Sequence, residues 1–338
     1  MVVRDRVAYH PKQPLWAQMP KIAGFSSEQQ PNTMSALQQA ALTVNSNLLV
    51  VADNVQAAQL PPGVTMHKTS ERLQLIVGPK VKRLDICHIN SGLDIELNFT
   101  ENADCLVVSN VYSGVVAQNI TANWQLAINA KVQHILNLHA DQGNFSWHQT
   151  VAQASSSSFQ AWRLVHSGAW CHEHTHCLLQ GEGAISEIKA LVLAFNGNNC
   201  QSGARFEHIA PRTDSNHQVN MLVAEQARAV CFSDVEVAVN AHDVSSEQYN
   251  KNLALAASAE IFTQPRLCIN NDKVVCSHGA TTGELEPAQL RYLCARGLSL
   301  SQAKKLLIMG YAQTILQDLP VDNWSATVLK KLGDFCAI

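Results

Sequence analysis

Short apolar runs alternate with polar positions through the middle of the chain, from about residue 71 to residue 280. Examples of these runs are LQLIVG, LDIELNF, CLVVSNVY, ALVLAF and VEVAVN. Alternation with a period of two, together with many β-branched residues, predicts β-strands, and helical periodicity is largely missing here. So many short strands predict a sandwich, a barrel or a β-solenoid. No repeat of fixed length is visible, so the pattern alone does not choose among the three.

From residue 284 onward the pattern becomes helical. Pro287 suits the first turn of a helix, and Gly297 suits a left-handed cap at its end. Ser299 and Gln302 form the pattern of a capping box, which predicts the start of a second helix. The positions of that helix that follow one apolar stripe are Ala303, Leu306, Leu307, Gly310, Tyr311 and Thr314.

The N-terminal segment, 1–70, has a mixed pattern. It predicts a short helix over 34–44, a buried strand within 47–54 and a turn at 61–63. A last short helix is predicted from about Trp324 to Leu332. The chain therefore divides into an N-terminal mixed unit (1–70), a β-rich core (71–282) and a C-terminal helical unit (283–338).

Composition and charge narrow the classes of function. Only 15% of the 338 residues are charged, which suggests surfaces covered by partners or by stacked strands. The net charge is −3 with no run rich in Lys and Arg, so nucleic acid is not expected as a partner. No signal peptide or membrane span is recognisable, and 10 scattered cysteines without C-x-x-C suggest a reducing compartment. We expect a cytoplasmic protein.

The stretch WCHEHTHC at 170–177 is the most prominent candidate for metal chemistry. On a strand, His172, His174 and His176 share one face, and the cysteine face continues to Leu179, which places the cysteines inward. Side chains two residues apart on a strand are roughly 6.6 Å apart, so one zinc ion does not readily take all three imidazoles. We interpret the stretch as an exposed polar strand with adventitious metal affinity. The alternative is a stand-alone β-rich metal-dependent enzyme that uses His174 and His176 of the His172/His174/His176 strand.

Three stretches between Phe206 and Tyr311 carry a resemblance to a known family. They are HIAPRTDSNHQVNMLVAEQ, NKNLALAASAEIFTQPRLCI and, most specifically, CSHGATTGELEPAQLRYLCARG. In this order they resemble the SufD family of the Suf iron–sulfur cluster assembly machinery. SufB proteins carry Glu after the corresponding histidine, so Gly279 points to SufD. Glu286 and Arg291 depart from the usual Asp and aromatic residue of that family.

The resemblance implies a mainly β fold: a parallel β-helix core with a small N-terminal unit and a C-terminal helical unit. It implies a scaffold subunit without catalytic activity of its own, which pairs with a SufB-like subunit through the β-helix. It further implies that the C-terminal helices dock a SufC-like ATPase, which binds the nucleotide; the sequence itself has no P-loop. A nascent iron–sulfur cluster would be shared transiently with SufB, and a homodimer in isolation is left open.

The same resemblance suggests site residues. His278 is the candidate ligand or proton-transfer group at the SufB interface, with Cys276 weaker on the same strand face and with Ser277 and Thr281 to orient the imidazole. A purely structural His278 that fixes the turn remains the other reading. We expect Leu306 and Leu307 to hold the helical pair to the body, and Tyr292 and Tyr311 to contact the ATPase. The full set of candidate partner-binding residues is Leu285, Tyr292, Leu293, Arg296, Gly297, Leu306, Leu307 and Tyr311.

Overall fold

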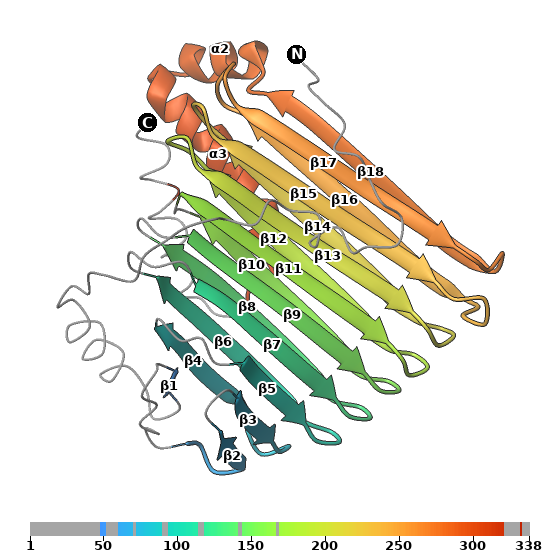
Figure 1. Cartoon of the computed structure of the whole chain (residues 1–338). Helices are drawn as coiled ribbons and strands as arrows, with labels where there is room; N and C mark the ends of the chain where they lie inside the picture. Colours follow the sequence, from blue (N-terminus) through green and yellow to red (C-terminus); the bar gives the residue numbers. More distant parts are fainter. Residues whose placement is uncertain are drawn as a thin grey trace, which may run out of the picture.

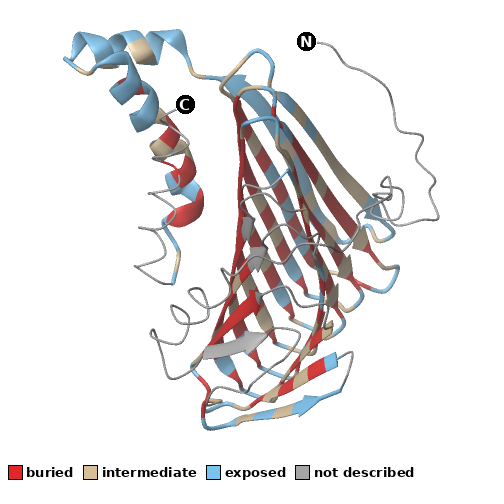
Figure 2. Cartoon of the chain, turned by 60° about the vertical axis from the view of Figure 1, so that its left-hand side comes forward, coloured by how far each residue is buried: buried red, intermediate tan, exposed pale blue. Residues whose placement is uncertain are grey.

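Two nine-stranded sheets lie face to face along the molecule (Figure 1 and Figure 2). The structure, a computed structural model, describes residues 48–51, 60–69, 72–89, 94–113, 118–140, 144–166, 169–320 and Leu332. Sheet A contains β1 (Leu48–Val51), β4 (Arg83–Ile89), β6 (Asp104–Ser113), β8 (Lys131–Ala140), β10 (Ser158–His166), β12 (Ile185–Ala194), β14 (Asp214–Val223), β16 (Val244–Ala254) and β18 (Val274–Glu284). Sheet B contains β2 (Val64–Lys68), β3 (Arg72–Val77), β5 (Asp94–Phe99), β7 (Gln118–Leu126), β9 (Asn144–Gln153), β11 (Trp170–Leu179), β13 (Asn199–His208), β15 (Arg228–Val237) and β17 (Glu260–Ile269).

From β3 onward the chain alternates between the two sheets, and each strand pairs in parallel with the strand two places further on. This is the arrangement of a β-solenoid, so the predicted parallel β-helix is confirmed. The length of one turn varies, because the interval from Lys131 to its partner Ser158 is shorter than the interval from Asp214 to its partner Ser245. Since corner loops of unequal length separate the strands, no repeat of fixed length shows in the sequence.

Six of the corners that lead from sheet B to sheet A, from the β5–β6 corner to the β15–β16 corner, share one backbone feature. Each of the six contains a residue with a left-handed φ of 55–71°, and most of these residues are not glycine. They are Asn102, Asn129, Ser156, Gly183, Arg212 and Asp243. Asparagine, aspartate and glycine tolerate this conformation best, so most of these corners carry a residue suited to the tight reversal.

The main core lies between the two sheets. In β5, Ile95, Leu97 and Phe99 are buried while the residues between them are partly exposed, and the same alternation recurs in neighbouring strands. Each turn therefore buries its apolar face against the turns beside it, and each fully buried aliphatic or aromatic side chain contributes about 1.5–3 kcal/mol. Replacing Leu97 by a charged residue would disrupt this packing between neighbouring turns.

A second apolar layer covers the outer face of sheet A (Figure 2). The helix α3 (Leu300–Leu316) packs Ile308, Ala312 and Ile315 against Leu191 and Leu222 of this sheet. The capping box of Ser299 and Gln302 begins α3 as predicted, and Gly297 with φ 96° ends the preceding helix α2 (Pro287–Ala295).

Predictions near the chain ends are tested only in part. The strand within 47–54 is present as β1, and Gly63 in the predicted turn has φ 97°. The helices predicted over 34–44 and from Trp324 to Leu332 lie outside the described residues, apart from Leu332, which is helical and buried. The three-part division of the chain stays a prediction. Among the described helices, none has the length and apolar character that crossing a membrane requires.

Candidate functional site

The C-terminal end of the solenoid is open. Sheet A stops at β18 and sheet B stops at β17, and in the part of the chain that the structure describes no further strand pairs with either (Figure 1). Residues of these two strands are exposed or half-buried, whereas the strands one turn earlier bury their inward faces. Phe262, Ile269 and Val275 are 41–75% exposed here. An uncovered edge with free backbone N–H and C=O groups is a template for pairing with another chain.

His278 lies at this open end, on the inward side of β18. Strand register places it directly beside Gln248 of β16. Two contacts fix the side to which alternate residues point: Asn252, which is buried between the sheets, donates to Thr282 at 3.2 Å, and Tyr249 on the outer face lies against Gly279. His278 therefore faces the interior of the solenoid but remains exposed, because no further turn covers it in the described part of the chain.

Cys276 shares this inward face, as predicted. Its side chain packs against the inner core and is half-buried, and burial raises the pKa of its thiol. A thiol must lose its proton to bind a metal ion. Cys276 is for this reason a poorer ligand than His278 unless a metal or a partner stabilises the thiolate.

The supporting role predicted for Ser277 and Thr281 is wrong. Both residues fall on the outward side of β18, opposite His278, because neighbouring residues of a strand alternate in direction. The sequence prediction took nearness along the chain for nearness in space. Gln248, one full turn of the solenoid earlier in the chain, occupies the adjacent inward position instead.

In the described structure, helix α2 is largely exposed to solvent. None of its residues is buried, and Tyr292 is 59% exposed with the guanidinium of Arg296 5.2 Å from its ring centre. Of the other candidates, Leu293 is half-buried, Gly297 is exposed in the turn between the helices, and Leu285 packs at the edge of the outer apolar layer.

The roles predicted for Leu306, Leu307 and Tyr311 of α3 are partly wrong. Leu306, expected to hold the pair to the body, is 51% exposed, and Leu307 is only half-buried. Tyr311, expected to face the ATPase, packs against the outer apolar layer, and its ring lies 5.2 Å from the ammonium of Lys251. The unbroken apolar run from Leu306 to Met309 allows more than one stripe, and the helix buries the one that contains Ile308.

The histidine strand is β11. Its cysteine face points into the core, as predicted, and its histidines point outward. The expectation of an exposed strand is wrong for His172, which is only 3% exposed beside the rings of His148 and Trp170, at 4.9 and 5.6 Å. Burial, reinforced by His148, lowers the pKa of His172 to about 3. Among the described residues, no three His, Cys, Asp or Glu side chains come together in a way that could hold a metal ion.

The structure contains a buried polar network inside the solenoid that the sequence analysis did not predict. Glu173 of β11 lies inside the solenoid, where its Oε1 is 3.3 Å from Nε of Arg163 on β10 and its Oε2 accepts from Ser202 at 3.0 Å. Arg163 also donates to Gln149 at 2.7 Å and contacts His134 at 3.1 Å. Burial raises the pKa of Glu173 in spite of the nearby guanidinium. Since alternation already placed Glu173 with the inward cysteines, its need for a buried partner was readable from the sequence.

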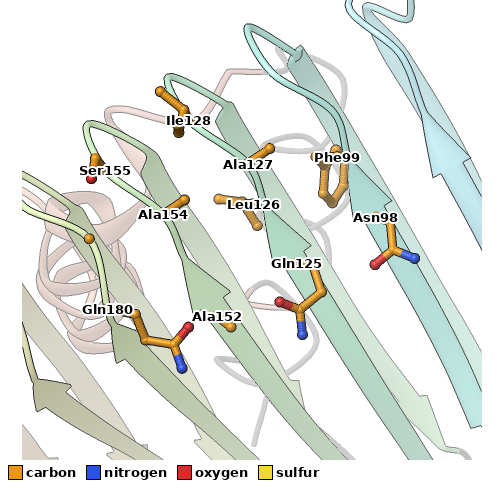
Figure 3. Close-up of a pocket in the computed structure, with 11 residues that line it drawn as sticks. Asn98, Phe99, Gln125, Leu126, Ala127, Ile128, Ala152, Ala154, Ser155 and Gln180 are labelled. Atoms are coloured by element: carbon orange, nitrogen blue, oxygen red, sulfur yellow. The ribbon is translucent and has the colours of Figure 1, made fainter.

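A shallow hollow lies near the carboxyl ends of β5, β7 and β9 (Figure 3). Its lining includes the amides of Asn98, Gln125 and Gln180 and small or apolar side chains. No acid, base, histidine or cysteine is among the lining residues that the structure describes. The hollow therefore offers no carboxylate, imidazole, amine or thiol for proton transfer or metal binding.

A comparison with known protein families identifies a match. Residues 94–311 match the profile described as "SUF system FeS cluster assembly, SufBD core domain". This range includes the solenoid from β5 onward, the open end and the helical pair up to Tyr311.

Individual relatives also have names that place them in the SufBD family. The iron–sulfur cluster assembly protein SufD of Escherichia coli (strain K12) is 26% identical over 313 residues, which cover 86% of this chain and 73% of that protein. The SufBD family protein slr0076 of Synechocystis sp. is 34% identical over 206 residues, 60% of this chain and 45% of that protein. SufB of Bacillus subtilis is 29% identical over 147 residues, 43% of this chain and 31% of that protein. Because the profile covers well over half of the sequence, this chain belongs to the SufBD family and is SufD-like within it.

Proposed function

We propose that this chain is a scaffold subunit for the assembly of nascent iron–sulfur clusters and has no catalytic activity of its own. It would pair with a SufB-like subunit through the open end of the solenoid. The single observation that carries this proposal is the pair of uncovered edge strands, β17 and β18, with apolar side chains exposed beside them. Family membership supports the link to cluster assembly, and the open edge supplies a surface on which a second solenoid can add its strands.

His278 would bind iron or transfer a proton at the joint, by which we mean the interface between the open end of the solenoid (β17 and β18) and the SufB-like subunit. Its imidazole lies on the inward side of the last strand, so a partner that covers the open end would enclose it. A neutral imidazole is a good ligand for iron and can also move a proton. The cluster would be held there transiently, as cargo shared with the partner, and Cys276 is the second candidate ligand.

The helical pair would dock a SufC-like ATPase. Tyr292 and Leu306 expose apolar surface there, and the segment from Pro287 to Leu316 carries Arg291, Arg296, Lys304 and Lys305 but no acidic residue. Exposed apolar side chains ringed by charge of one sign favour a partner surface that is apolar at its centre and acidic at its rim. ATP would be bound by that partner, and the assembly would work in the cytoplasm.

The decisive experiment reconstitutes the complex of this chain with SufB-like and SufC-like subunits. One sample contains the unchanged chain and the other contains the His278→Ala variant. Cluster formation is followed by visible absorbance and subunit association by sedimentation. We expect association to be kept and cluster formation to be lost. The matched control is Thr281→Ala on the outward side of the same strand, which should change neither. Normal cluster formation by His278→Ala would leave only a structural role for this histidine.

No observation favours the alternative of a stand-alone metal-dependent enzyme. His172 is enclosed by rings, and the described residues contain no cluster of three ligands around His174 and His176. Whether the chain forms a homodimer without its partners is a separate question. The open end would serve such a pairing as well, and sedimentation of the isolated chain tests it.

A further inference from the structure

Four side chains form a ladder along the inward side of sheet A. Successive strands bring Ile188, His217, Gln248 and His278 into register, one on each of β12, β14, β16 and β18. Neighbouring strands of a sheet are about 4.8 Å apart, so each side chain in such a ladder lies against the next. The side chain of His278 therefore lies next to that of Gln248.

Gln248 is buried without a partner for its amide. The residue is 3% exposed, and neither Nε2 nor Oε1 makes a hydrogen bond among the described residues. An amide removed from water in this way is costly unless another polar group satisfies it. The question is which neighbour does so.

In the described structure, neither the residue one turn earlier on the ladder nor the residue across from Gln248 on sheet B makes a hydrogen bond to its amide. His217, one turn earlier, already places its Nδ1 2.7 Å from the hydroxyl of Ser233 on the facing sheet. One turn later, the position of Ser233 is taken by Pro265, which has no polar side chain to offer Gln248. The contact that satisfies His217 therefore has no equivalent for Gln248.

The neighbour above is His278, whose exposed imidazole has no hydrogen bond among the described residues. A neutral imidazole has one N–H donor and one acceptor nitrogen, and the amide oxygen of Gln248 can accept from the donor. If it does, one tautomer is fixed and the lone pair of the other nitrogen is left for the open end. Support of this kind through the second nitrogen is common for metal-binding histidines.

We propose that Gln248 is the positioning residue of His278: its amide oxygen accepts the imidazole N–H and presents the opposite nitrogen at the open end of the solenoid. The functional part of this inference rests on the proposed function. The contact between the two side chains does not, so the two can be tested apart.

The first test reads the tautomer of His278 by nitrogen-15 NMR of the isolated full-length chain labelled on histidine, with signals assigned by His278→Ala. We expect a single tautomer in the unchanged chain. Gln248→Met, which removes both polar atoms at nearly constant length, should give a mixture. The control Ser246→Ala, on the adjacent ladder beneath Cys276, should keep the single tautomer.

A mixture of tautomers in the unchanged chain, or a single tautomer that persists in Gln248→Met, would overturn the contact. Should Gln248→Met not fold, Gln248→Leu replaces it, since the same ladder already holds Ile188, and the spectrum of the unchanged chain decides alone if neither folds. Gln248→Glu, which keeps an acceptor at the same reach, should restore the single tautomer.

The second test measures cluster formation by the reconstituted complex. Gln248→Met should slow it about ten-fold or more, the usual effect of removing a group that orients a ligand, with subunit association unchanged. A changed tautomer with normal cluster formation would overturn the positioning role while keeping the contact. Normal cluster formation by His278→Ala would instead remove the proposed function, whatever Gln248 does.

Discussion

Arg163 on β10 and Glu173 on β11 belong to consecutive strands in opposite sheets, and their ion pair joins sheet A to sheet B inside the core. Both side chains are at most 1% exposed. Their attraction offsets the desolvation of two charges only while both partners are present. We therefore expect the pair to contribute more to fixing the arrangement of the sheets than to the stability of the fold.

Removing one partner of this pair should be far more harmful than removing both. Arg163→Met should lower the free energy of unfolding by about 3–5 kcal/mol, because it leaves Glu173 buried without a counter-charge. Arg163→Met combined with Glu173→Met should recover most of this loss. Urea unfolding of the two variants measures the difference, and equal losses would contradict the interpretation.

Acid should weaken the fold through its buried histidines. Because the pKa of His172 is about 3 in the folded chain and about 6.5 when unfolded, unfolding takes up a proton between these values. The stability that neutral His172 contributes is present above pH 6.5 and is lost as the pH falls toward 3. His172→Gln should flatten the pH dependence of the unfolding free energy by about 1.4 kcal/mol per pH unit between pH 6 and 4. Denaturant titrations across this range check it; an unchanged slope would speak against the buried neutral state.

Pairing at the open end should depend on Val275, which is 75% exposed on β18. Val275→Asp should weaken binding of a SufB-like subunit about ten-fold or more, because a partner strand that pairs with the free edge of β18 would pack a side chain against Val275, and a carboxylate there would lose part of its water. Binding is measured by interferometry on the immobilised partner. Ile128→Asp, an exposed apolar position far along the solenoid, is the control and should bind normally. Equal binding by both variants would place the joint elsewhere.

Docking of the ATPase should depend on Leu306 more than on Tyr311. Leu306→Asp should reduce affinity for a SufC-like subunit about ten-fold or more, and rising salt should weaken the unchanged complex because the helical segment carries four basic residues and no acidic one. Gln313→Asp, on an exposed position of the same helix, controls for added charge. Titration calorimetry at two salt concentrations measures both effects. A complex insensitive to salt and to Leu306→Asp would exclude this surface.

The strands were predictable because alternation is a local property. The inward face of β11, with Cys171, Cys177 and Leu179, followed from period two alone. The pairing of strands did not follow, because turns of unequal length hide the repeat. The parallel β-helix came from the resemblance around CSHGATTG and not from periodicity.

The site was predictable only as far as the motif reached. His278 was found through its motif, whereas Gln248 depends on the register between strands a full turn apart in the chain, which no local pattern gives. The buried stripe of α3 was misjudged for a similar reason. A run of adjacent apolar residues leaves the rotation of a helix undetermined until the sheet beneath it selects Ile308 and Ile315.

The two ends of the described solenoid differ, and this difference limits how copies can associate. At the N-terminal end, β1 has four residues, and β2 has five and runs antiparallel to β3, with Thr65, His67 and Lys68 exposed. In sheet B the edge strand β2 is thus short, partly polar and reversed, which makes it a poor template for further strand addition, whereas β1 at the edge of sheet A is short but apolar and parallel to β4. If the open end pairs as proposed, a molecule whose other end carries the reversed strand β2 would form a pair and then stop. Polymerisation into fibres, the hazard of stacked parallel strands, would thereby be disfavoured.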